Sequence, residues 1–329
     1  MIGMGSVALF QCQENVTDPF SYSPVPIFHV PRGAHTERMA IPEQQLERWS
    51  HQGAIAASSQ THNSIRGALD NYTWPSGMRY DAYLQGSYPN ATNIRGDSDV
   101  DLVVETDSVF YSNLTDDEKR RLGLETGRFT WSEFREHVVR ALQSYFGTHR
   151  VDATGNKCIK VRPTDNTLAA DVIPCVEYRR YNNLQVVAQG MTFWTRNTNT
   201  QVINYPKIHI QKGADKNKRV SQWYKPSIRM LKNARNNFRH SGDDPGGRFP
   251  SYFLECMLYN VPDSCYRGSF VDTYVAVVRN LCFMRDNNAL GQMVTQSEQQ
   301  WLFGTAIYQW SERDAIALIE EFVHLWTEW

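Results

Sequence analysis

The 329-residue chain lacks several features that would place it in a common class of proteins. Its six cysteines are scattered, with no C-x-x-C pair and no Cys/His group at zinc spacing, which favours reduced, buried thiols. No apolar run approaches the ~20 residues that span a bilayer. No Lys or Arg precedes Arg32, which argues against a Sec signal. We therefore expect a cytoplasmic protein with no membrane segment.

The chain also has no excess of one charge, since its 34 Lys plus Arg residues are nearly balanced by 35 Asp plus Glu residues. The overall charge thus gives no reason to expect a protein that coats nucleic acid or a membrane surface. The G-x-x-x-x-G-K-[ST] loop, the G-x-S-x-G elbow and the H-E-x-x-H motif are absent, so kinase-like, hydrolase and zincin activities lose their usual support. Any nucleotide contact must come from local clusters of residues.

With 41% apolar residues, the chain is long enough to bury a substantial core. Its patterns predict three parts: an N-terminal extension over residues 1–38, an α/β lobe over 39–205, and a helical lobe over 206–329. The first part is rich in proline and shows no helical or strand period. The patterns predict an α+β fold.

Within the second part, apolar spacing predicts a long or broken helix after residue 41, with Ser58 or Ser59 as its cap. Short β-rich runs predict strands within 81–105 and 157–176, and the spacing over 131–146 predicts a helix. In the third part Ser311 and Asp314 form a variant capping box. The helices predicted there lie near 222–239, 251–259, 269–284 and 298–328.

The segment YLQGSYPNATNIRGDSDVDLVVE (residues 83–105) carries the clearest chemical signal. Asp99 and Asp101 are two apart in a predicted strand, so both carboxylates leave the same face. Asp171 interrupts a second apolar run, and an acid inside a buried strand needs a partner. A hard cation such as Mg²⁺ or Mn²⁺ would relieve the repulsion between such carboxylates. A D-x-D alone is more often a solvated turn. Asp97 lies outside the pattern and is interpreted as a turn or capping residue.

The combination of Gly86–Ser87, a D-x-D pair at Asp99 and Asp101, and a third acid at Asp171 resembles the DNA polymerase β-like nucleotidyltransferases. More closely, residues 40–329 resemble the bacterial relatives of cyclic GMP-AMP synthase and oligoadenylate synthetase, called CD-NTases. The resemblance implies a mixed twisted sheet with flanking helices, a C-terminal helical lobe, and an active site in the cleft between them.

The resemblance also implies roles for these residues. Gly86 and Ser87 would hold the donor triphosphate, while Asp99, Asp101 and Asp171 would bind two Mg²⁺ or Mn²⁺ ions. Asp171 would bind the ion nearest the attacking hydroxyl and help to deprotonate it. The second ion would neutralise charge on the leaving pyrophosphate.

Ten Lys or Arg residues lie between Lys207 and Arg239, against one acid, Asp215. On a helix from about residue 223, the basic side chains form one stripe facing a cleft or solvent, beside an apolar stripe. Such a stripe is as often a simple solvated face. The residues of that stripe are Lys225, Arg229, Lys232, Asn236 and Arg239.

Lys232, followed by Ser251–Tyr252, resembles the order found in cyclic GMP-AMP synthase, which implies that Lys232 and Ser251 contact donor phosphates and that Tyr252 stacks on a base. His209 and His240 receive no role, since a lone histidine is more often a surface or packing residue. No zinc-bearing insertion for docking DNA is present, so duplex DNA is not expected to be required.

The leading hypothesis is a template-independent enzyme that builds a cyclic di- or trinucleotide messenger from ATP and a second NTP in bacterial anti-phage (CBASS) signalling. Its partners would be NTPs, an effector that reads the product, and accessory regulatory proteins. One alternative is a nucleotidyltransferase that acts on RNA ends, a protein or a small molecule. Another is an inactive nucleic-acid-binding scaffold, although inactive homologues usually lose an acid and this chain keeps all three.

Overall fold

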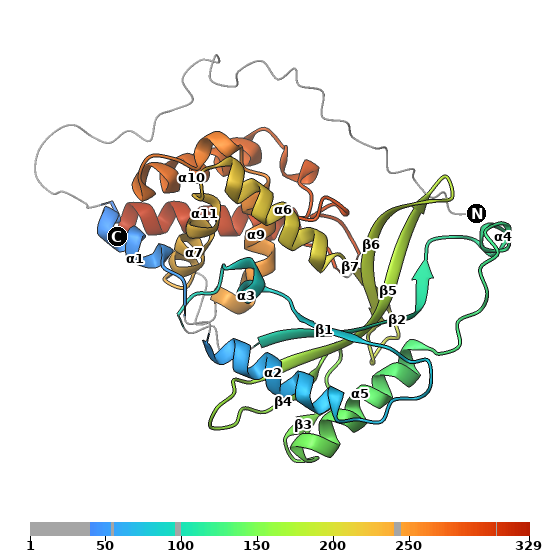
Figure 1. Ribbon diagram of the computed structural model, residues 1–329. Coiled ribbons are helices and arrows are strands. Elements are labelled where there is room, and N and C mark those ends of the chain that lie inside the picture. The colour runs from blue at the N-terminus through green and yellow to red at the C-terminus, as the bar shows by residue number, and fades with distance from the viewer. Residues whose placement is uncertain (1–39, 54–55, 96–99, 240–244, 307) are drawn as a thin grey trace, which may run out of the picture. The chain divides into compact units, whose positions relative to one another are not determined.

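The computed structural model describes residues 40–53, 56–95, 100–239, 245–306 and 308–329. Within these residues, one mixed sheet contains seven strands, and its central path runs in the order β1-β2-β5-β4-β3 (Figure 1). A hairpin extends the sheet, because β6 pairs with β5 and β7 pairs with β6. The strands are β1 (Asp81–Leu84), β2 (Val100–Ser112), β3 (Val151–Asp152), β4 (Ile159–Val161), β5 (Ala170–Asn182), β6 (Gln185–Trp194) and β7 (Gln201–Asn204).

The long strands β2 and β5 run parallel to each other, whereas the other pairings are antiparallel. Alternation in β2 separates the two faces of the sheet. Leu102 and Val104 pack into the core below the sheet, while Val103 joins a small core under β6 and β7. Asp101 therefore shares the second face with Val103.

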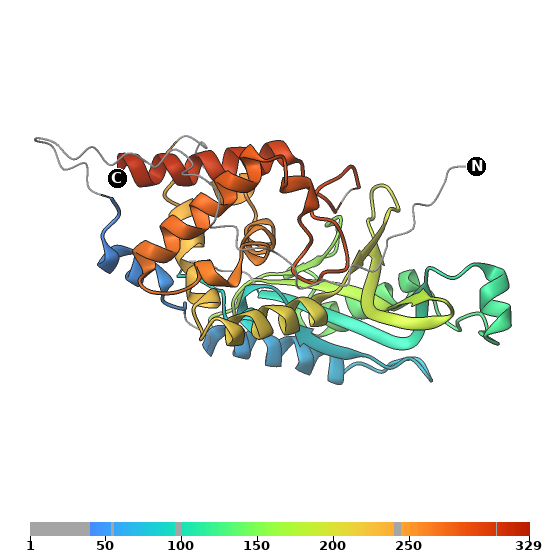
Figure 2. The ribbon, with the colours of Figure 1, turned by 90° about the horizontal axis from the view of Figure 1, so that it is seen from above.

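Helices α2 (Ala56–Asp70) and α5 (Trp131–Phe146) cover the first face, as Figures 1 and 2 show. The predicted helix over 131–146 is confirmed. Its start is fixed by a capping box, in which the Thr130 hydroxyl accepts from the Glu133 amide and the Glu133 carboxylate accepts from the Thr130 amide. A short helix, α4 (Asp116–Arg121), carries a second capping box in the loop after β2.

The C-terminal half is helical, and the predicted boundary after residue 205 falls between β7 and α6. One apolar core joins the helices over residues 224–235, 251–259, 270–286 and 312–328, with Tyr224, Phe253 and Phe322 among its fully buried side chains. The helices are α6 (Pro206–Arg219), α7 (Tyr224–Arg235), α8 (Pro245–Arg248), α9 (Ser251–Tyr259), α10 (Phe270–Asp286) and α11 (Glu312–Glu328).

The first helix, α1 (Glu43–Ser50), packs into this helical core through Leu46 and Trp49. The Glu43 carboxylate also accepts hydrogen bonds from the Phe270 and Val271 amides, at 2.8 and 2.7 Å, where α10 begins. A carboxylate at a helix N-terminus satisfies amides that have no partner within the helix. Residues early in the chain therefore stabilise the last third of it.

Some predicted element ends are wrong. Ser58 and Ser59 lie inside α2, which begins at Ala56, so neither is its cap. The last helix begins at Glu312 rather than near 298, because Ser311 accepts from the Asp314 amide and caps it, as its sequence predicted. Residues 298–306 instead form bends and isolated bridges to neighbouring segments.

Five cysteines fall in the described part of the chain, and all are free thiols, as the sequence predicted: Cys158, Cys175, Cys256, Cys265 and Cys282. Of the helices described here, none has the length and apolar character needed to cross a membrane.

Candidate active site

The loop after β1 is built around a glycine that no other residue could replace without strain. Gly86 has φ +74° and ψ −143°, and it begins the short helix α3 (Ser87–Asn90). A Cβ atom at this position would lie 2.5 Å from Oδ2 of Asp101. Both the positive φ and the close approach require glycine here. The predicted Gly86–Ser87 pair therefore lies directly against a predicted acid.

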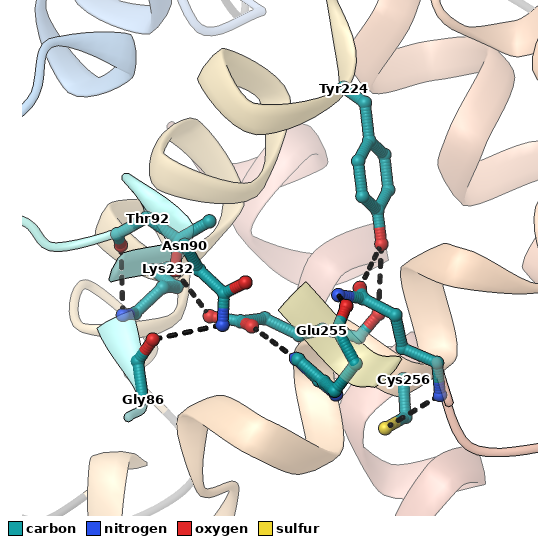
Figure 3. Close-up of polar contacts among 9 residues, drawn as sticks. Gly86, Asn90, Thr92, Tyr224, Lys232, Glu255 and Cys256 are labelled. Carbon is teal, nitrogen blue, oxygen red and sulfur yellow. Dashed lines mark hydrogen bonds and ion pairs between the residues drawn. The ribbon is translucent and has the colours of Figure 1, made fainter. Parts of the chain in front are cut away.

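The far end of α3 is held in a second unusual conformation. Ala91 is left-handed, with φ 54° and ψ 36°. The Thr92 amide returns to the Ser87 carbonyl at 2.9 Å, which closes the turn. Asn90 donates to the Gly86 carbonyl at 2.9 Å (Figure 3). We call residues 86–92 the phosphate loop, after the role that the sequence resemblance implies for Gly86 and Ser87.

Asp101 and Asp171 are register partners on the parallel strands β2 and β5, and both are half-buried. Partners on adjacent strands lie about 5 Å apart and share a face. The sequence prediction that the third acid lies on a neighbouring strand is thus met by the pairing. Asp99 and Asp97 lie outside the described residues.

Cys158 lies beside these two acids. Burial, the charge of Asp171, a hydrogen bond with Asp171 and the charge of Asp101 together raise the pKa of the Cys158 thiol to about 12, although Lys160 opposes the shift. The thiol is therefore protonated at neutral pH. The donor atoms offered at this face are carboxylate oxygens rather than a thiolate.

The chemistry of the face fits a hard divalent cation. Carboxylate oxygens are the ligands that Mg²⁺ and Mn²⁺ prefer, and a cation between Asp101 and Asp171 would relieve their repulsion. Among the described residues, no group of three His, Cys, Asp or Glu side chains is arranged around one point. Because that set omits Asp99, the predicted three-acid group lies partly outside it.

The basic stripe on α7 differs from its prediction. Lys232 is 0% exposed, and its Nζ donates to the Thr92 carbonyl at 3.0 Å (Figure 3). Arg229 donates to the Ser50 and Ala91 carbonyls, both at 2.5 Å, and burial lowers its pKa to about 10. The stripe faces the end of α1 and the phosphate loop at these residues, so of the two alternatives left open, a cleft or solvent, a plain solvated face does not describe Arg229 and Lys232. Burial of Lys232 also argues against a direct phosphate contact.

Ser251 and Tyr252 begin α9. The Ser251 hydroxyl accepts from Arg235 at 3.3 Å. The Tyr252 ring stacks against His209, with centroids 5.1 Å apart and planes 21° apart, and lies 5.6 Å from Trp310. Tyr252 is still 40% exposed, so part of the ring is available to a planar ligand.

Sequence reasoning missed two side chains that join these parts. Glu255 is buried in α9, and His209 is buried in α6. A signal existed for the first, because Glu255 is a single acid inside an apolar run, which is the feature that singled out Asp171. For the second, Pro206 at the first turn of α6 marks a helix that was not predicted.

Residues of β1, β2, β5, β6 and the start of α6 line a cavity of about 400 Å³. None of the predicted site residues lines it. Its carboxylates are already paired in part, since Glu105 accepts from Lys207 at 2.8 Å and Glu177 accepts from Arg179. The full lining is Arg79, Tyr80, Asp81, Tyr83, Glu105, Asp107, Glu177, Gln189, Gly190, Pro206 and Lys207.

Comparison with known proteins decides the family. The model of the cGAS/DncV-like nucleotidyltransferase C-terminal helical domain matches residues 211–327. Over 295 residues the chain is 47% identical to the cyclic UMP-AMP synthase of Rhodothermus marinus, covering 88% of this chain and 99% of that protein. The chain is a CD-NTase. The predicted family, and with it the nucleotidyltransferase activity, are confirmed.

Other relatives of this CD-NTase agree. It is 36% identical to the cyclic nucleotide synthase CdnE01 of Staphylococcus haemolyticus, over 88% of this chain and 100% of that protein. The Rhodothermus marinus structure with Apcpp and Upnpp matches with a TM-score of 0.81, at 47% identity, and covers 88% of this chain and 97% of that one. The predicted α+β, polymerase β-like fold is confirmed.

Proposed function

We propose that this CD-NTase joins two NTPs, with ATP and UTP as the first candidates, into a cyclic dinucleotide. The observation that carries the proposal is the register pairing of Asp101 with Asp171, next to the Gly86–Ser87 turn. The relative of 47% identity is a cyclic UMP-AMP synthase, which supports a cyclic product made of two nucleotides with this pair of bases. A cyclic trinucleotide, which the sequence alone left open, becomes the less favoured product.

In this proposal Asp99, Asp101 and Asp171 hold two Mg²⁺ or Mn²⁺ ions. When bound, the ions lower the pKa of the attacking hydroxyl and offset charge on the leaving group. The Gly86 conformation brings the loop backbone against Asp101. Gly86 and Ser87 are proposed to hold the donor triphosphate beside the cations that the acids would bind.

The reaction itself is an in-line displacement. A ribose hydroxyl of the acceptor attacks the α-phosphorus of the donor, the new O–P bond forms, and the bond to pyrophosphate breaks. Asp171 is proposed to receive the hydroxyl proton. A second displacement within the linear dinucleotide triphosphate releases another pyrophosphate and closes the ring.

Donor recognition falls to α9. Stacking on Tyr252 supplies affinity with little base selectivity. Ser251 is proposed to reach a phosphate, while Lys232 supports the phosphate loop from behind through the Thr92 carbonyl. Lys232 thus moves from the direct phosphate contact predicted for it to a supporting position, because its side chain is fully buried.

The proposed biological setting comes from the resemblance to the CD-NTases and agrees with the chemistry of the product. A cyclic nucleotide is a diffusible messenger, so we propose anti-phage signalling in the cytoplasm, with an effector that reads the product and accessory proteins that regulate its synthesis. The enzyme is proposed to act without duplex DNA.

The test is incubation of the purified protein with all four radiolabelled NTPs and Mg²⁺, then phosphatase treatment and mass spectrometry. Phosphatase-resistant label with the mass of a cyclic dinucleotide is expected, and omitting ATP or UTP should remove most of it. Label that remains phosphatase-sensitive, or that appears only on added RNA, would favour the RNA-end alternative. No incorporation would favour the inactive scaffold.

A further inference from the structure

A buried carboxylate links the two halves of the candidate donor site. Thr92, at the end of the phosphate loop, donates from its hydroxyl to Oε1 of Glu255 at 2.6 Å. Nε2 of His209 lies 3.3 Å from Oε2 of the same carboxylate. Because a carboxylate only accepts, Nε2 carries the proton in this contact. Glu255 thereby connects the loop after β1 to α6 through a single side chain.

The same carboxylate is tied to the proposed base platform in two ways. Glu255 follows Tyr252 by three residues and Ser251 by four in α9, so the three lie on one side of the helix. In addition, the His209 ring that donates to Glu255 stacks on the Tyr252 ring at 5.1 Å. If the Glu255 carboxylate moved, the position of the Tyr252 ring would therefore change too. The movement would be transmitted through α9, which carries both residues, and through the His209 ring.

The group is charged and fully enclosed. Burial raises the pKa of Glu255, but the hydrogen bond from His209, the positive charge of Lys232 and the hydrogen bond from Thr92 outweigh burial and leave the pKa below its ordinary value. Lys232 completes the arrangement by donating to the Thr92 carbonyl (Figure 3). Thr92 is held at its carbonyl from α7 and at its hydroxyl from α9.

One polar atom of this cluster stays open. In the described part of the chain, Nδ1 of His209 is buried and has no hydrogen-bond partner. A buried polar atom without a partner is costly, and native structures keep such atoms rarely. The atom belongs to the ring that stacks on Tyr252, so the open position lies next to the proposed base platform.

We propose that Glu255 is a positioning residue that fixes the phosphate loop and the Tyr252 ring relative to each other, so that one donor NTP meets both. This inference rests on the proposed function. Glu255 acts through Thr92 on the phosphate side and through His209 on the base side, and it touches no substrate itself. Its contribution is to donor binding, by holding two contact surfaces at a fixed spacing.

Calorimetry with an ATP analogue that cannot be cleaved at the α-phosphorus, in the presence of Mg²⁺, tests the proposal. Glu255→Gln is expected to weaken binding about tenfold, ~1.4 kcal/mol. Thr92→Val should weaken it comparably, whereas Thr92→Ser, which keeps the hydroxyl, should restore it. The matched control is Asp263→Asn in the same lobe. It removes a carboxylate that forms ion pairs with Lys216 and Arg219. It should lower Tm without changing Kd.

A double-mutant cycle separates positioning from general destabilisation. If Glu255 acts through Tyr252, then Glu255→Gln should cost less affinity in a Tyr252→Ala background than in the native protein. Should Glu255→Gln fail to fold, Thr92→Val carries the same test.

Two outcomes would overturn the inference in different ways. Native protein that makes the cyclic product and binds the analogue, with Glu255→Gln and Thr92→Val binding it like Asp263→Asn, would refute the positioning role alone. Native protein that neither binds the analogue nor makes a product would remove the proposed function, and the positioning role with it.

Discussion

The sheet face and the helical side of this enzyme treat charge in opposite ways. On the sheet, Asp101 and Asp171 are paired in register with like charge, and both stay half-buried. On the helical side, Lys232 and Glu255 have opposite charge and are buried almost completely. The first arrangement is costly for the protein alone, whereas the second is balanced within the chain.

The difference separates residues that act on a ligand from residues that hold the site. Like charges kept near the surface are arranged for something outside the chain, which in the proposed function is a pair of cations. Opposite charges sealed inside connect elements, here the phosphate loop with α7 and α9. A count of charges along the sequence cannot make this distinction, but burial can.

The largest effect should come from the acids of the sheet. Asp101→Asn and Asp171→Asn are each expected to reduce cyclic product formation by about 100-fold or more, with Tm unchanged or raised because one repelling charge is removed. Asp171→Asn should retain donor binding, since its proposed task is the attacking hydroxyl. The matched control is Asp107→Asn on the same strand, which should remain active. Substantial activity in both acid variants would remove the distinction between the two regions.

Gly86→Ala should have the next largest effect on activity. The added methyl group would lie 2.5 Å from Oδ2 of Asp101, on a backbone with φ +74°. The control is Gly123→Ala, where φ is +63° and nothing lies within 4 Å of the added carbon. Gly123→Ala should lose about 1 kcal/mol of unfolding free energy from its left-handed backbone. Gly86→Ala should lose more, because ψ −143° places that residue close to a region that is essentially restricted to glycine. Only Gly86→Ala should also lose most of its activity. Equal activity in the two would mean that the close approach to Asp101 is unimportant.

Lys232→Met tests how much the buried charges of the helical side contribute to stability. Removing the Lys232 charge leaves the buried negative charge of Glu255 with less positive charge to balance it. We expect a loss of about 3 kcal/mol in unfolding free energy, measured by denaturant titration. Lys218→Met, at an exposed position of α6, should change stability little. A stable Lys232→Met protein that had lost only triphosphate affinity would instead favour the direct phosphate contact.

A smaller effect should appear with pH. The pKa of Glu255 is lowered from its ordinary 4.5, so its carboxylate stabilises the fold above that pH. The contribution is lost as the pH falls through the lowered pKa. The stability difference between native protein and Glu255→Gln should therefore be full at neutral pH and shrink well below pH 4.5. A difference independent of pH would contradict the assigned charge.

The least change is expected from duplex DNA. The basic residues Arg229 and Lys232 are occupied by backbone carbonyls rather than spread over an open surface. A DNA-docking face must neutralise several phosphates and shows a steep salt dependence. Adding duplex DNA at low salt should change product formation by less than about tenfold, which corresponds to ~1.4 kcal/mol in barrier. A larger increase would point to a DNA-binding surface.

Sequence was sufficient for the elements whose signals are local. Apolar spacing identified α5, and the runs around Asp101 and Asp171 identified the two strands that carry them. The hairpin of β6 and β7 was not predicted, because β6 is partly exposed along much of its length and shows no clear alternation. Ser311 was identified as a cap by its neighbour Asp314, yet the helix was started too early.

The helical side of the site could not be predicted in the same way. Spacing placed Lys232 correctly on one stripe of α7, but spacing does not tell which element covers that stripe. The partner, Thr92, is 140 residues away in the sequence. The contact between Glu255 and Thr92 spans 163 residues and depends on tertiary packing that brings α9 beside the segment after α3, for which no single segment carries a pattern.

Metal binding tests the central claim most directly, because it measures what the paired acids are proposed to do. Mn²⁺ can be titrated into the protein with the non-hydrolysable ATP analogue present, and bound ions counted by electron paramagnetic resonance. We predict two bound ions per chain for the native protein and for Asp107→Asn, and fewer for Asp101→Asn and Asp171→Asn. Equal Mn²⁺ binding by all four proteins would contradict the assignment of Asp101 and Asp171 as ligands.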